Sequence, residues 1–67
     1  MKLAAYLLEN KLTQNQFLDL LYEKTGTRLS QGGLSKYIKG QRTPRKAEMI
    51  KIYEITKGEV QPNDFYL

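Results

Sequence analysis

Three glycines occupy places where helices are expected to end, because glycine adopts the positive φ of a helix C-terminus without strain. They are Gly26, Gly40 and Gly58. A residue able to cap a helix N-terminus begins each of the segments that these glycines close, namely Thr13, Ser30 and Thr43. No stretch alternates apolar and polar residues over the length of a strand, so the chain is predicted to be all-α, with short helices and tight turns.

The start signals differ in kind. Thr13 and Gln16 fit a capping box, and Leu12 and Phe17 have the spacing of a hydrophobic staple. Pro44 follows Thr43, which is the pattern of a proline in the first helical position. We therefore expect helices over residues 3–10, 14–24, 31–39 and 44–56, and a further helical turn over 62–66.

Apolar residues at helical spacing predict the core. The expected inward residues are Leu3, Tyr6 and Leu7 in the first helix, with Ala4 and Leu8 beside them; Phe17, Leu20 and Leu21 in the second, alongside Leu18; Leu34, Tyr37 and Ile38 in the third; and Ala47, Met49, Ile50, Ile52, Tyr53 and Ile55 in the fourth. Four apolar residues near the C-terminus have two possible uses, which are closure of the core over the first and fourth helices or contact with a second copy. These are Val60, Phe65, Tyr66 and Leu67.

The composition excludes several classes of function. At 67 residues the chain is expected to form a single domain, 1–67, and it contains no cysteine and no histidine. Thiolate metal sites and the commonest general base are therefore ruled out, and we expect no cofactor or metal. Asp19 and Glu23 form the one pair that resembles a catalytic dyad, and a solvated helix face explains them better. We expect a cytoplasmic protein that is not an enzyme, has no membrane span and has no small-molecule ligand.

The net charge of +4 conceals a one-sided distribution. Residues 24–46 include seven Lys and Arg and no Asp or Glu, whereas the rest of the chain has four basic and seven acidic residues. A surface that is only solvated mixes the two signs. The block therefore predicts a polyanionic partner, and the alternative is a basic face without any partner.

The basic block surrounds the expected helix 31–39. This helix would turn Leu34, Tyr37 and Ile38 to one side and polar residues to the other, as a helix in the DNA major groove does. Gly32 and Gly33 are unusual there, since each costs roughly 1 kcal/mol relative to alanine. Either the first turn is irregular, or the missing side chains allow a close approach of the backbone to DNA.

Several motifs occur in a characteristic order: Leu12-Thr13-Gln14, Ser30-Gln31, Leu34-Ser35, Gly40 and Arg42-x-Pro44. This order resembles the helix-turn-helix domains of phage Cro and cI-type repressors, over essentially the whole chain. The stretch from Gly58 to Phe65 is also similar to the Gly-x-Val-x-Pro-x-Asp-Phe pattern of YdaS-like Cro regulators. The interval from Gln14 to Gln31 is about six residues longer than in the tightest members, whose inter-helix turn has three or four residues.

The resemblance implies a compact four- to five-helix, lambda-repressor-like domain with a DNA-binding surface. The family's base-reading positions correspond to Gln31, Gly32, Ser35 and Lys36. Its phosphate-binding positions correspond to Thr13, Gln14, Lys39, Gln41, Arg42 and Arg45. Glutamine can bond to adenine, lysine to guanine and serine to either base, while a helix N-terminus can hold a phosphate.

The sequence thus predicts a sequence-specific regulator that binds double-stranded DNA as a weak homodimer and represses promoters by occupying an operator. The alternative is an antitoxin or anti-regulator that acts mainly through protein–protein interaction, using its apolar C-terminal segment. A basic peripheral membrane protein fits less well, because the basic residues do not lie opposite one long apolar face.

Overall fold

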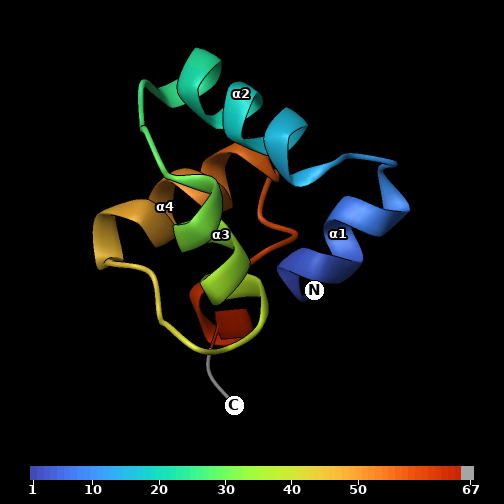
Figure 1. Cartoon of the computed structure of the whole chain (residues 1–67), viewed down its shortest axis with the longest axis vertical. Coiled ribbons are helices and arrows are strands. Elements are labelled where there is room, and N and C mark those ends of the chain that lie inside the picture. Colours follow the sequence, from blue (N-terminus) through green and yellow to red (C-terminus); the bar gives the residue numbers. More distant parts are fainter. Residues whose placement is uncertain (66–67) are drawn as a thin grey trace.

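The computed structural model of the chain describes residues 1–65. Within them lie four α-helices and one 3₁₀ turn: α1 (Leu3–Glu9), α2 (Gln14–Thr25), α3 (Gln31–Ile38), α4 (Lys46–Ile55) and η1 (Pro62–Phe65). Residues 1–65 contain no strand, so the prediction of an all-α domain with four to five helices is confirmed. Figure 1 shows α2 along the top of the molecule, α3 in front of α4, and α1 to one side.

The predicted glycine stops lie at helix ends. Gly26, Gly40 and Gly58 have φ angles of 73°, 75° and 81°. Gly40 shows how such an end is built: its N–H donates to the Tyr37 carbonyl at 3.3 Å, and the next N–H, of Gln41, donates to the Lys36 carbonyl at 2.9 Å. These bonds occupy carbonyl groups that the end of α3 would otherwise leave without a donor, and they turn the chain away.

Two of the three predicted starts are confirmed. Thr13 Oγ1 accepts from the Gln16 N–H at 3.1 Å, and the Thr13 N–H donates to Gln16 Oε1 at 2.8 Å, which is a complete capping box. Ser30 Oγ accepts from the Gly33 N–H at 3.0 Å and caps α3. These two caps fix where α2 and α3 begin.

The predicted start of the fourth helix was wrong by two residues. α4 begins at Lys46 rather than at Pro44, and Pro44 is buried in the turn before it. The Arg45 N–H donates to Glu48 Oε1 at 3.0 Å, so the acidic residue three positions further on supplies the acceptor that Thr43 was expected to provide. Arg45, which follows the buried Pro44, is extended with φ −67° and ψ 157°, so the helix begins only after it.

The core joins all four α-helices to the segment after α4. Its fully buried apolar side chains are Phe17, Leu21, Leu34, Ile52 and Val60. Phe65 also packs against this cluster, so Val60 and Phe65 close the core, whereas Tyr66 and Leu67 lie outside the described residues. Thr56 supports Val60 here, since its Oγ1 accepts from the Val60 N–H at 3.1 Å and donates to the Ile52 carbonyl at 2.8 Å.

Some residues predicted to face inward do not. Leu8 is 82% exposed, and Ile50 and Tyr53 on α4 are 44% and 45% exposed. Ala47 is exposed as well. The apolar face of α4 was read as one wide stripe, but only one side of it, including Met49 and Ile52, reaches the core.

The two ends of the described chain meet. The Met1 ammonium lies 2.8 Å from Asp64 Oδ2 and donates to the Glu59 carbonyl at 2.9 Å. The hydrogen bond from this ammonium, together with one from the Gln61 N–H, holds the pKa of Asp64 below its usual value. These contacts fix η1 beside α1. No helix within residues 1–65 is long and apolar enough to cross a membrane.

Candidate nucleic-acid interface

The orientation of α3 follows from its packing. Leu34 is completely buried, and Tyr37 and Ile38 are partly buried on the same side. The opposite side is exposed and carries Gln31, Gly32, Lys36 and Lys39. The connection from α2 to α3 has only five residues, 26–30, so most of the extra interval before Gln31 lies within the 12-residue α2.

An open hollow lies where the N-terminal ends of α2 and α3 meet, and we call it the α2–α3 hollow. It is lined by Thr13, Gln14, Asn15, Gln31, Gly32, Ser35 and Lys39. Six of the ten predicted site residues are in this set. Some come from the start of α2 and the others from α3 and its end, more than a dozen positions later in the sequence. Asn15 is the one lining residue that the sequence did not indicate.

The α2–α3 hollow also holds backbone donors. The first N–H groups of a helix have no acceptor within that helix. The caps use those of Gln16 and Gly33, and they leave the N–H groups of four other residues without an acceptor in residues 1–65. These four residues are Gln14, Asn15, Gln31 and Gly32, and all of them line the hollow. Two positive helix ends therefore converge on one surface, which favours an anionic or acceptor-rich partner.

A second hollow, of about 270 Å³, lies on the other side of α3, and we call it the arginine hollow. Its lining residues are Arg28, Leu29, Ser30, Gly33, Tyr37, Arg42, Thr43, Arg45 and Glu48. Arg42 and Arg45 were predicted to bind phosphate, and the structure places them together. The hollow is smaller than the roughly 300–1,000 Å³ of sites for drug-sized ligands, so it suits a small group such as a phosphate.

Arg28 was not assigned a contact from the sequence. Its guanidinium carbon lies 4.5 Å from the centre of the Tyr22 ring, and its Nη2 donates to the Tyr22 hydroxyl at 3.3 Å. The stacking holds Arg28 beside the hollow that Arg42 and Arg45 also line. Arg28 and Tyr22 are six residues apart with Gly26 between them, and no sequence pattern predicts a contact at this spacing.

Tyr37 connects α3 to α4 at the edge of the arginine hollow. Its hydroxyl donates to Glu48 Oε1 at 2.9 Å. Burial raises the pKa of the Tyr37 phenol, and the hydrogen bond and charge of Glu48 raise it further, while Arg42 and Arg45 act in the opposite direction. The same Glu48 oxygen caps α4, so one carboxylate connects the two helices beside the arginines.

The basic residues of segment 24–46 are not neutralised inside the protein. The ion pairs among residues 1–65 are Met1 with Asp64 and Lys51 with Glu54, and neither involves this segment. Lys36 and Gln41 line neither hollow, but both are exposed, Lys36 on the outward side of α3 and Gln41 just beyond its end. The positive charge around α3 is therefore available to a partner.

The two glycines of α3 differ in their surroundings. A Cβ on Gly32 would meet no atom within 4 Å, so the fold itself does not require glycine there. A Cβ on Gly33 would lie 3.1 Å from Ser30 Oγ and would crowd the cap. The first turn of α3 is regular and capped, which removes the explanation by an irregular turn for Gly32.

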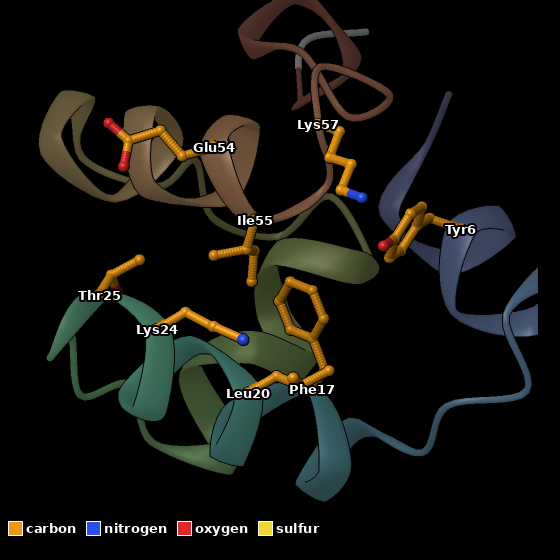
Figure 2. Close-up of a pocket in the computed structure, with 8 residues that line it drawn as sticks. All are labelled: Tyr6, Phe17, Leu20, Lys24, Thr25, Glu54, Ile55 and Lys57. Carbon is orange, nitrogen blue, oxygen red and sulfur yellow. The ribbon is translucent and has the colours of Figure 1, made fainter.

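An apolar hollow of about 330 Å³ lies away from α3, between α1, α2 and the end of α4. Figure 2 shows its lining residues, with Phe17 and Ile55 pointing toward one another and Lys57 reaching toward Tyr6. Its wall is mainly apolar. Residues 1–65 contain no group of three His, Cys, Asp or Glu side chains that could hold a metal.

No protein-family model, curated protein or solved structure matches this chain.

Proposed function

We propose that this protein is a helix-turn-helix regulator that binds double-stranded DNA in a sequence-specific manner and represses promoters by occupying an operator. The observation that carries the proposal is the α2–α3 hollow. Two capped helix N-termini, four backbone N–H groups without an acceptor and the polar side chains of α3 converge there. The major groove of DNA presents phosphate oxygens and base-edge acceptors, and these can accept hydrogen bonds from the donors of this surface.

In this proposal α3 lies in the major groove. Gln31 bonds to adenine, Lys36 donates to guanine and Ser35 contacts either base. Gly32, which has open space beside it, lets the backbone of α3 approach the DNA closely. Thr13 and Gln14 hold a phosphate at the N-terminus of α2.

The phosphates on the other side of α3 meet the arginine hollow and the turn after α3. Lys39, Gln41, Arg42 and Arg45 bind them and fix the register of the helix without reading sequence. The regulator acts in the cytoplasm of a bacterial or phage-infected cell, needs no cofactor, and pairs on DNA because one helix covers too few base pairs to select a site.

Selection from random double-stranded DNA, followed by sequencing of the retained fragments, tests the proposal. The expected result is an enriched palindromic motif. A variant with Gln31→Ala and Lys36→Ala serves as the matched control, since both side chains are exposed and their loss leaves the core intact. The proposal is wrong if the wild-type protein enriches no motif, or if the control variant enriches the same motif equally well.

One observation favours a second candidate, a protein that acts through protein–protein interaction. The apolar hollow in Figure 2 offers the partly exposed Leu20 and Ile55 to a partner side chain. The C-terminal segment is a weaker basis than the sequence indicated, because Val60 and Phe65 are used in the core. Leu20→Lys would abolish such an interaction and leave DNA selection unchanged, so the two candidates are separable.

A further inference from the structure

The outward face of α4 exposes three apolar or aromatic side chains, Ala47, Ile50 and Tyr53, to solvent. The exposed positions on this face are Lys46, Ala47, Ile50, Tyr53 and Glu54. They follow the spacing i, i+1, i+4, i+7 and i+8, which is one continuous stripe along a helix. Ile50 and Tyr53 remain 44% and 45% exposed in the middle of it.

The stripe is symmetric about Ile50. Lys46 and Glu54 lie four residues to either side of it, and Ala47 and Tyr53 lie three residues to either side. If two copies of α4 pack antiparallel across a two-fold axis at Ile50, each residue faces its mirror position in the partner. Lys46 then faces the partner's Glu54, and Ala47 faces the partner's Tyr53.

Both pairings are complementary. The first joins opposite charges, and the second places a small side chain against a large one, which lets the helices approach. A parallel arrangement would place Lys46 against Lys46 and Glu54 against Glu54, and each of those pairs is repulsive. Because a two-fold interface makes every contact twice, both ends of the stripe are satisfied in the antiparallel pair.

The Glu54 side chain is exposed and can reach a partner. Figure 2 shows its carboxylate turned away from Phe17 and Ile55. One oxygen, Oε2, is 3.9 Å from Lys51 Nζ in an exposed pair, and such pairs contribute little in water. Pro44, Lys46, Met49, Ile50 and Pro62 line a mainly apolar hollow beside the stripe, which extends the surface that a partner can cover.

We infer that the outward face of α4 is a self-association surface, through which two copies of this chain form an antiparallel α4–α4 dimer centred on Ile50. The dimer is weak by itself. A standard interface covers about 800 Å² on each partner, about one-sixth of the 4685 Å² surface of this protein. One face of a ten-residue helix, which is only about 15 Å long, covers less than that. Its role in DNA binding rests on the proposed function, since two half-sites then hold the two copies together.

Cross-linking through an introduced thiol tests the interface. The chain has no cysteine, so Ile50→Cys supplies a single thiol at the two-fold axis. Helix axes about 8–10 Å apart, less the Cα radius of about 2.3 Å on each side, leave about 3.4–5.4 Å between facing Cα atoms. The upper part of this range lies within the roughly 4.4–6.8 Å that a disulfide spans. Leu8→Cys is the control, because Leu8 is the more exposed residue at 82% and lies on α1.

In dilute protein without DNA, Ile50→Cys is expected to form the disulfide dimer at least tenfold faster than Leu8→Cys. Equal rates, or faster cross-linking through Leu8→Cys, would overturn the inference. Both positions are exposed, so a folding defect does not confuse the comparison, and circular dichroism of the reduced variants checks this directly.

Charge reversal tests the antiparallel register. Lys46→Glu and Glu54→Lys should each weaken self-association, because each creates two like-charged pairs. A mixture of the two variants should form a mixed dimer at least tenfold tighter than either homodimer, measured by sedimentation equilibrium at low salt. Three equal dissociation constants would rule out the register. Since neither experiment contains DNA, their failure leaves the proposed DNA binding intact, and a failed DNA selection leaves this interface intact.

Discussion

The Tyr37 hydroxyl on α3 donates a hydrogen bond to Glu48 Oε1 on α4 at 2.9 Å. Glu48 also accepts from the Arg45 N–H, so the bond connects the helix proposed to read DNA to the cap that starts α4. Arg42 and Arg45 lie close enough to influence the phenol electrostatically. One carboxylate thus connects α3 to the N-terminal cap of α4, beside the hollow that Arg42 and Arg45 line.

Replacing Tyr37 with phenylalanine removes this bond and leaves the ring in place. The expected loss of unfolding free energy is about 0.5–1.5 kcal/mol, the usual value of one hydrogen bond. Urea unfolding at neutral pH measures it. The raised pKa of Tyr37 adds a second readout, because its contribution to stability is present below the ordinary tyrosine value of about 10 and is lost as the pH rises through the folded-state value. Wild-type protein should therefore lose more stability above pH ~10 than Tyr37→Phe does, and parallel losses would contradict the assignment.

Asp64 should make the stability of the protein depend on pH in the acidic range, whereas Tyr37 does so in the alkaline range. Its pKa is lowered by the hydrogen bonds from the Met1 ammonium and the Gln61 N–H. Its contribution is therefore present above its ordinary value of about 4 and is lost as the pH falls through the lowered folded-state value. Asp64→Asn should be less stable than wild type at pH 7 and nearly equal to it at pH ~2. Thermal unfolding at the two pH values checks this, and a constant difference would refute it.

The sequence predicted those parts of the fold that depend on local chemistry. The Thr13 box, the Ser30 cap and the glycine ends need only neighbouring residues, and all of them occur. The start of α4 was missed because Glu48 supplies its cap, and the Tyr37 hydroxyl of α3 also bonds to that carboxylate, a tertiary contact that the local preference for a proline in the first turn does not include.

The sequence predicted most residues of the candidate site, but not which of them lie together in space. The resemblance supplied Thr13 and Gln31, and their meeting in one hollow depends on how α2 packs against α3. Arg28 was missed because its place is set by the Tyr22 ring, which no periodic pattern encodes. Ile50 was assigned to the core because periodicity marks an apolar face without saying whether the chain itself covers that face.

A substitution at Gly32 should affect the stability of the protein and its DNA binding in opposite directions. Since a Cβ there meets open space, Gly32→Ala should stabilise the protein by about 1 kcal/mol through the gain in helix propensity. If the bare backbone of α3 faces DNA, the same variant should bind its selected site more weakly. Urea unfolding and DNA titration report the two effects. Gly40→Ala is the contrasting variant, because its φ of 75° makes any side chain unfavourable, and it should lose stability. A stabilised Gly32→Ala with unchanged affinity would show that α3 does not approach DNA closely at this position.

Residues that read bases and residues that hold phosphates should respond differently to substitution. Gln31→Ala and Lys36→Ala should each weaken binding to the selected site by about 1–3 kcal/mol, with a smaller effect on random DNA. Arg42→Ala and Arg45→Ala should weaken binding to all sequences alike and reduce the salt dependence by about one phosphate contact each. Titrations with selected and random duplexes across salt concentrations distinguish the two patterns. If all four variants gave the same pattern, α3 would not be the reading helix.

Arg28 should behave as a third phosphate contact of the arginine hollow. Its guanidinium is stacked on Tyr22 beside the hollow that Arg42 and Arg45 line, and no carboxylate in residues 1–65 pairs with it. Arg28→Ala should lower the affinity for selected and random DNA alike and reduce the slope of log affinity against log salt by about one phosphate contact. Arg28→Lys keeps the charge but loses the planar stacking, so it should restore the slope while recovering only part of the affinity.

Lys51→Ala controls for the loss of one positive charge, because Lys51 lines neither hollow beside α3. Its salt slope should equal that of the wild type, since a charge remote from the phosphates releases few counterions. Urea unfolding of Arg28→Ala checks that the loss of stacking, worth about 0.5–1 kcal/mol at an exposed site, does not unfold the protein. If Arg28→Ala and Lys51→Ala had the same slope, Arg28 would not contact a phosphate.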